Sequence, residues 1–262
     1  MTPGNYLEHA VSGYRKLAPE RQVQACGELF SLALKAPRFL LPPGGLTVDN
    51  TLQHLMTPIR LPSPCTVLEY VDGDGLKVVH IATEVTGSGN ELCIEVCTLH
   101  SVPGNPWRFQ FLAHKPCINV NVAPSTNNGK MSGKLRTVAE HAYVPMDAEL
   151  EVTFANSAVP VLALIQVLQC CNVKTTRVLP PPALNKKRIA SGKLPFVEYR
   201  VLTIDGGSSV SGTGSGTHSS PRQHIRRGHI RRLADERRIW IHQCLVGDPR
   251  KGLIVKDYRV RA

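Results

Sequence analysis

A period of two in hydrophobicity runs through residues 64–115 and constrains the fold more than any other feature of the chain. The four segments in which apolar and polar side chains alternate are residues 66–71, 77–85, 92–96 and 107–111. Such alternation is typical of strands with one face on a core, and the run Asp72-Gly73-Asp74-Gly75 is typical of a tight turn. We therefore predict an antiparallel meander of these four strands, with a further strand over residues 149–155.

Two other segments combine apolar residues with helix signals. Along residues 19–35 apolar side chains recur every three or four positions, and Pro19 suits the first turn of a helix. A second apolar run follows Ser157, whose hydroxyl can cap a helix, and it is shorter than a membrane span of about 20 residues. We predict helices over residues 19–35 and 157–170 that pack on the sheet. The expected fold class is α+β, an antiparallel sheet with packed helices, plus a basic and mostly β C-terminal module.

Charge divides the chain into two parts. The net charge is +11, yet residues 1–173 hold 12 Lys+Arg against 14 Asp+Glu, whereas residues 174–262 hold 19 against 6. A positive field of this kind attracts nucleic acid or another polyanion. We predict an N-terminal α+β domain over residues 1–173 and a basic C-terminal β module over residues 174–262, with a Gly/Ser-rich loop at residues 206–216.

The tetrapeptide His-Ile-Arg-Arg occurs twice around Gly228, at residues 224–227 and 229–232. Positions five apart face opposite sides of a strand, but a β-bulge at Gly228 would bring His224 and His229 to the same face. Two imidazoles beside guanidinium groups suit metal-independent phosphodiester cleavage, with His224 and His229 as acid and base. The favoured alternative is a surface that holds phosphates without catalysis.

Cationic side chains surround the two histidines, and such groups bind phosphate oxygens. The candidate phosphate ligands of this region are Arg222, Arg226, Arg227, Arg231, Arg232, Lys256 and Tyr258. A second basic element consists of Lys186, Lys187 and Arg188, and it either extends this surface or is a solvated connector. The two β-prone runs over residues 238–246 and 253–260 are predicted to form a hairpin.

Neither a metal nor a cofactor is expected. Two-metal nucleases need clustered carboxylates, and residues 218–262 hold a sparse set: Asp235, Glu236, Asp248 and Asp257. A zinc site at Cys93, Cys97 and His100 is disfavoured, because four residues of strand separate the thiols by about 13 Å. None of the glycine-rich nucleotide-binding motifs occurs.

Most of the eight cysteines lie inside apolar runs, as is typical of reduced thiols in the cytoplasm. No signal-peptide pattern opens the chain. We therefore expect a cytoplasmic protein without a membrane partner.

Several C-terminal motifs point to a group of proteins. They are Leu184 to Tyr199, His218-Ser219-Ser220-Pro221-Arg222, the double His-Ile-Arg-Arg, Ile239-Trp240-Ile241 and Lys256-Asp257-Tyr258. Together they resemble accessory proteins carried by tailed phages and prophages. The resemblance covers the C-terminal third well, implies a phage origin and a host-cell cytoplasmic setting, and transfers no catalytic residues.

Two functions follow as expectations. The first is a phage-encoded nucleic-acid-binding protein, RNA-directed in one version, to which the paired histidines would add cleavage. The alternative is a protein–protein inhibitor of a host enzyme or antiviral defence complex, in which the N-terminal domain contacts the target.

Overall fold

The computed structural model describes residues 5–17, 20–46, 58–86, 92–112, 114–121, 126–127, 130–131, 134–137, 143–144, 148–204, 222–226, 228–241, 244–246 and 248–254. Its helices are α1 (Tyr6–Leu17), α2 (Glu20–Lys35), α3 (Ala148–Leu168) and α4 (Pro182–Ala190). The presence of both helices and sheet confirms the α+β class. Helix α2 confirms the helix predicted over residues 19–35, apart from Pro19, which lies outside the described residues.

Among the residues that the structure describes, ten strands form one large sheet. In chain order they are β1 (Arg38–Leu40), β2 (Cys65–Val71), β3 (Lys77–Thr86), β4 (Leu92–Val102), β5 (Asn105–Phe111), β6 (His114–Asn119), β9 (Lys134–Thr137), β10 (Tyr143–Val144), β11 (Val173–Val178) and β12 (Tyr199–Ile204). Their order across the sheet is β10-β9-β6-β4-β3-β2-β1-β12-β11, and β5 pairs with β4. The domain boundary predicted after residue 173 therefore falls at the start of β11, and β11 and β12 both belong to this sheet.

The predicted meander is confirmed, because β2, β3, β4 and β5 pair antiparallel in chain order. In the turn before β3, Asp72 Oδ1 accepts the N–H groups of Asp74 and Leu76 at 2.9 and 2.8 Å, and Gly75 takes a φ of +81°. The expectation of an antiparallel sheet is wrong at β1, which runs parallel to both β2 and β12. Parallel neighbours need a long connection, and residues 41–64 supply one between β1 and β2.

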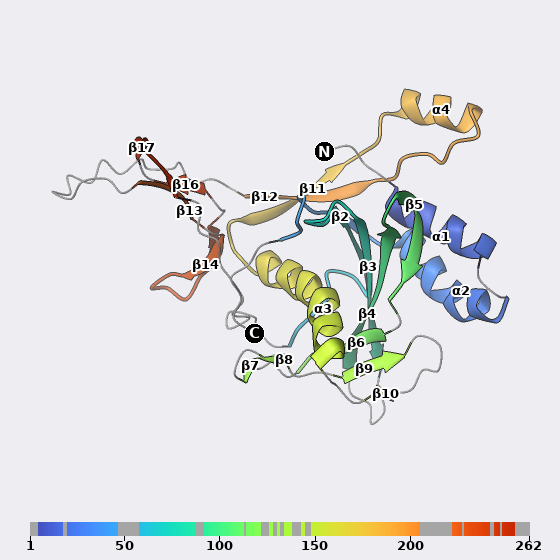
Figure 1. Cartoon of the computed structure of the whole chain (residues 1–262), viewed down its shortest axis with the longest axis horizontal. Helices are drawn as coiled ribbons and strands as arrows, with labels where there is room; N and C mark the ends of the chain where they lie inside the picture. Colours follow the sequence, from blue (N-terminus) through green and yellow to red (C-terminus); the bar gives the residue numbers. More distant parts are fainter. Residues whose placement is uncertain are drawn as a thin grey trace.

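Helices cover both faces of the sheet, with α3 on one face and α1 and α2 on the other (Figure 1). The core under α3 includes Leu68, Val78, Ala82, Leu162 and Leu164. The core under α1 and α2 includes Leu7, Phe30, Val67, Val79 and Ile81. Successive side chains of a strand point to opposite faces, so β2 is buried at six successive positions.

Helix α3 begins nine residues earlier than predicted. The strand predicted over residues 149–155 is wrong, since these residues form the first turns of α3, and Ser157 is buried inside the helix rather than capping it. Three alternations of apolar and polar residues are too few to separate a strand from a helix. None of the described helices, α3 included, has the length and apolarity of a membrane-spanning helix.

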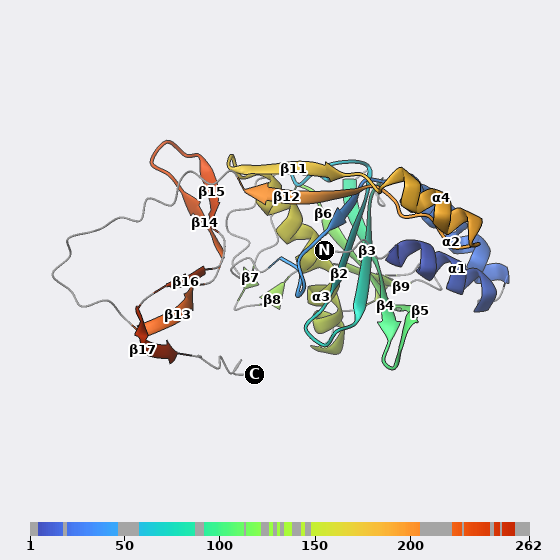
Figure 2. The same cartoon turned by 90° about the horizontal axis from the view of Figure 1, so that it is seen from above.

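Short strands make up the remaining sheets (Figure 2). They are β7 (Thr126–Asn127), β8 (Lys130–Met131), β13 (Arg222–Arg226), β14 (His229–Arg232), β15 (Arg238–Ile241), β16 (Cys244–Val246) and β17 (Asp248–Ile254). The hairpin predicted between residues 238–246 and 253–260 is wrong. Strand β15 pairs with β14, whereas β16 and β17 lie on either side of β13. The two copies of His-Ile-Arg-Arg therefore pair with different strands.

Candidate nucleic-acid interface

The two copies of His-Ile-Arg-Arg lie in different sheets. His224 is on β13, which pairs with β16 and β17, whereas His229 is on β14, which pairs with β15. Gly228 is buried and falls between these two strands along the chain, instead of forming a bulge within one strand. The strand geometry expected to bring both histidines to one face is therefore not formed.

The β14–β15 hairpin docks on the core beneath α3. Ile230 and Trp240 are cross-strand partners, both are buried, and both belong to that core. Asn172 fixes the hairpin in place, because its Nδ2 donates to the Trp240 carbonyl at 2.9 Å and its Oδ1 accepts the Trp240 N–H at 2.8 Å. Alternation along β14 then directs His229 and Arg231 away from the core.

The tip of this hairpin matches its cations with carboxylates. Arg232 forms an ion pair with Glu236, and the Arg237 Nε donates to Asp235 Oδ2 at 2.7 Å. Arg231 is exposed and forms no ion pair with any residue that the structure describes. Exposed ion pairs are weak, so a phosphate could replace either carboxylate, although the existing pair must first be broken. A phosphate that binds Arg231 breaks no such pair.

Several predicted ligands are placed only in part. Arg222 and Arg226 are on β13 together with His224. Arg227, Lys256 and Tyr258 lie outside the described residues, as does the predicted loop over residues 206–216.

The second basic element forms an arm, defined here as residues 179–197, between β11 and β12. It includes α4, which projects beyond the edge of the sheet (Figure 1). The segment interpreted as either part of the phosphate surface or a solvated connector is thus partly helical. Its cations are Lys186, Lys187, Arg188 and Lys193, it contains no Asp or Glu, and no residue of α4 is buried.

Contacts within the arm hold it in one shape. The Asn185 side chain donates to the Phe196 carbonyl and accepts the Phe196 N–H, both at 2.8 Å. Arg188 donates from Nε to the Leu194 carbonyl at 2.8 Å, and its guanidinium lies 4.0 Å from the centre of the Phe196 ring. These contacts therefore join α4, which precedes residue 192, to the part of the arm that follows it.

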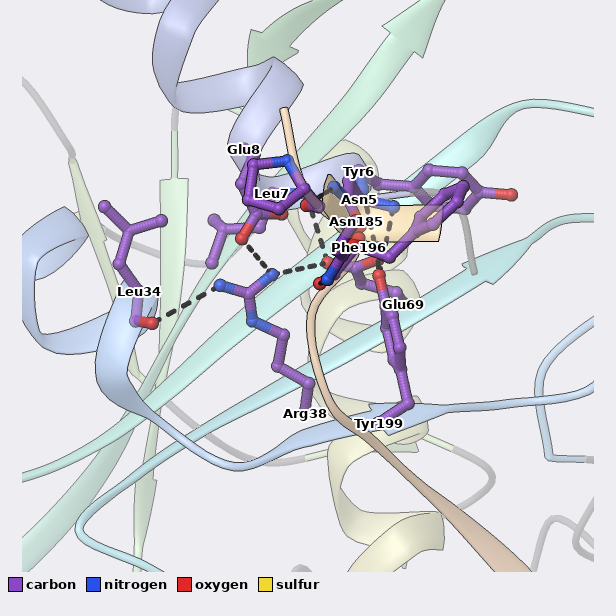
Figure 3. Close-up of polar contacts among 11 residues, drawn as sticks. Asn5, Tyr6, Leu7, Glu8, Leu34, Arg38, Glu69, Asn185, Phe196 and Tyr199 are labelled. Carbon is purple, nitrogen blue, oxygen red and sulfur yellow. Dashed lines mark hydrogen bonds and ion pairs between the residues drawn. The ribbon is translucent and has the colours of Figure 1, made fainter. Parts of the chain in front are cut away.

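A buried polar network attaches the arm to the N-terminus of α1 (Figure 3). Asn5 donates from its side chain to the Pro195 carbonyl and from its backbone to the Tyr199 hydroxyl, the latter at 3.0 Å. Tyr199 in turn donates to Glu69 at 2.7 Å, and Glu69 accepts the N–H groups of Tyr6 and Leu7 at 3.1 Å each. A carboxylate at a helix N-terminus meets both free amides and the positive end of the helix dipole.

One arginine, Arg38, supplies the positive charge of this network. The Arg38 side chain forms an ion pair with Glu8 and lies 3.8 Å from Glu69. The pKa of Glu69 is raised above its usual value, chiefly by burial, and the Tyr199 hydrogen bond and the Arg38 charge offset only part of that rise. The network spans α1, β1, β2 and β12, and we assign it the role of positioning the arm.

Beside the arm lies a cluster of aromatic and cationic side chains, defined as His9, Lys77 and Trp107. The centres of the Trp107 ring, on β5, and the His9 ring, on α1, are 4.4 Å apart. The Lys77 ammonium lies over the Trp107 ring, 2.9 Å from the centre of that ring. Burial chiefly, and then the charge of Lys77, lower the pKa of His9, and Arg188 of the arm also lowers it. The arm therefore brings a cation near this cluster.

Sequence reasoning did not identify this cluster. Its members come from α1, β3 and β5, and their proximity depends on how these elements pack. The one available signal was a tryptophan beside Arg108 at the edge of the predicted meander.

Two cavities offer little chemistry at neutral pH. A cleft of about 500 Å³ beside α3 contains His80, whose ring nitrogens contact the hydroxyls of Tyr70 and Thr98 at 2.9 and 2.8 Å. Burial lowers the pKa of His80 to about 3, so its imidazole is neutral. A cavity of about 310 Å³ contains Cys65 and Cys97, whose pKa values burial raises to about 11 and about 12, so both are thiols. No cluster of metal-ligating side chains occurs among the residues that the structure describes.

Comparisons with protein-family models, with curated proteins and with solved structures found no match.

Proposed function

We propose that this chain is a nucleic-acid-binding protein that holds phosphates on the arm and on the β14–β15 hairpin. The observation that carries the proposal is the arm itself, which presents four cations without a carboxylate. Its shape is fixed before any ligand arrives, so less conformational entropy is lost on binding. The resemblance of the C-terminal motifs to those of phage accessory proteins supports the cytoplasm of an infected cell as the setting of this activity.

The salt dependence of binding tests this proposal. Each phosphate neutralised by a Lys or Arg releases counterions, so the affinity should fall linearly with salt on logarithmic axes. Fluorescence anisotropy with labelled RNA and DNA measures this slope for the intact chain. Binding that does not change between low and moderate salt would contradict the proposal.

A double variant locates the surface. Lys186→Gln with Lys187→Gln removes two arm cations that form no ion pair with any residue that the structure describes, and it should reduce the magnitude of the salt slope by about 2. Lys35→Gln, an exposed lysine at the end of α2, is the matched control and should leave the slope unchanged. Equal salt slopes for the unaltered chain, the double variant and the control would show that the arm is not the interface.

A protein partner is the second candidate function, because the arm also exposes large apolar side chains. Leu179 is 66% exposed and Ile189 is 61% exposed, and smaller exposed areas come from Leu184 and Leu194. Together with the cations they fit an acidic surface on a host enzyme or defence complex. Capture from host lysate, with and without nuclease, separates the two functions: partners lost after nuclease support nucleic-acid binding, and partners that persist and require Ile189 support inhibition.

Cleavage remains a separate proposal, resting on His224 and His229. Their strands belong to different sheets, so a shared active site would need contact across those sheets. Incubation of RNA with the protein in chelator tests it. Cleavage that either His→Ala variant abolishes, with binding retained, would support catalysis, and intact RNA would leave the binding function alone.

A further inference from the structure

We propose that Trp107 is a stacking site for an unpaired base, which makes the preferred ligand single-stranded nucleic acid. The inference rests on the proposed function and adds the class of nucleic acid to it. It concerns the cluster of His9, Lys77 and Trp107.

The exposure of Trp107 is the first observation. It lies on β5, outside the main path of the sheet, and it is 49% exposed, whereas Trp240, the other tryptophan of the chain, is 6% exposed. An indole offers a large rigid face whose burial is favourable, so a half-exposed tryptophan has surface left for a planar ligand.

The surrounding charges are the second observation. The Lys77 ammonium lies over the face of the Trp107 ring, 2.9 Å from its centre, and 5.4 Å from the centre of the Tyr6 ring, so this cation rests on the aromatic face and moves aside when a base stacks there. Arg188 is close enough for its charge to lower the pKa of His9. A nucleotide needs both groups, an aromatic face for the base and cations for the phosphates on either side.

Selectivity for single strands follows from these positions. The base faces of a duplex are stacked on one another and cannot reach an aromatic side chain without unpairing. Single-stranded binding proteins combine a basic track with aromatic side chains, and the arm beside Trp107 supplies that combination. Every base has such a face, so the site does not discriminate sequence.

The two tryptophans provide the test. A uridine oligomer of about 12 nucleotides, matched to the length of single-strand sites, should quench the tryptophan fluorescence of the intact chain. In Trp107→Phe the remaining fluorescence comes from Trp240, and the quenching should disappear. Phenylalanine keeps an aromatic face, so this variant also shows that the fold and binding survive.

Affinities complete the test. Trp107→Ala should weaken binding of the uridine oligomer at least about fivefold and leave binding of an RNA duplex of equal length unchanged. Leu32→Ala, at an exposed apolar residue of α2, is the matched control and should alter neither. Unchanged oligomer binding in Trp107→Ala, or quenching that persists in Trp107→Phe, overturns this inference and leaves the proposed function intact. An intact chain that binds neither nucleic acid overturns both.

Discussion

The arm and the β14–β15 hairpin are both basic, yet they present their cations differently. They lie at opposite ends of β11, since Asn172, just before that strand, holds the hairpin and the arm begins after it (Figures 1 and 2). The hairpin pairs Arg232 and Arg237 with carboxylates two to four residues away, whereas the arm has no carboxylate at all. Net charge alone therefore does not show which cations are available to a phosphate.

The two regions also rest on different faces of the sheet, each with a buried titratable group. Glu69, below the arm, is on the face covered by α1, as its neighbour Val67 is. His80 is two residues from both Val78 and Ala82 on β3 and shares their face, which α3 covers and on which the hairpin docks. Each group can be perturbed separately, so the support of the arm and the support of the hairpin can be tested one at a time.

The largest effect is expected from Glu69→Ala. This variant leaves two α1 amides and the Tyr199 hydroxyl without their acceptor, while Arg38 keeps its ion pair with Glu8. Each buried donor left without an acceptor costs about 1–3 kcal/mol, so the free energy of unfolding in urea should fall by at least about 3 kcal/mol. The arm should also become sensitive to proteolysis, while the hairpin should not.

Glu198→Gln is the control for this variant. Glu198 pairs with Arg177 at 2.6 Å, but on the surface at the base of the arm, where ion pairs contribute little. We expect no marked change in stability. An unstable Glu198 variant beside a stable Glu69 variant would show that surface pairing, and not the buried network, positions the arm.

Over the first pH unit below about 6.5, a smaller effect is expected from acid, through His80. Its pKa is lowered to about 3 in the folded protein but is near 6.5 in the unfolded chain, so between these values the unfolded state binds the extra proton. Stability should therefore fall as pH falls from about 6.5 towards 3, with His80 contributing at most about 1.4 kcal/mol per pH unit. Urea unfolding across this range measures the slope, and His80→Asn should reduce it. An identical slope in the variant would exclude His80 as the source.

Local pattern predicted the parts of the fold that local sequence determines. The alternation over residues 66–111 and the spacing of apolar residues in 19–35 were sufficient for the meander and for α2. The parallel strand β1 was missed because its neighbours, β2 and β12, are set by long-range packing. In the same way, apolar alternation over residues 149–155 yielded to the long apolar helix α3.

The candidate site divides along the same line. Lys186, Lys187 and Arg188 were identified from charge alone, and the structure adds that they lie on a helix with no acidic neighbour in the arm. Trp107, His9 and Lys77 come from three elements that are distant in sequence, so no spacing rule could connect them. The repeat at residues 224–232 was overinterpreted as one strand because strand partners cannot be known from spacing.

The smallest expected effect tests the comparison most directly. Glu236→Gln removes the carboxylate that pairs with Arg232 and so makes one hairpin cation resemble those of the arm. Nucleic-acid affinity should rise a few-fold at low salt, and the magnitude of the salt slope should increase by about 1, because one more cation is free to displace counterions. Glu28→Gln, an exposed acidic residue on α2, makes the same change in net charge and serves as the control. If both variants strengthen binding equally, total charge governs the interaction and the distinction between paired and unpaired cations has no consequence for binding.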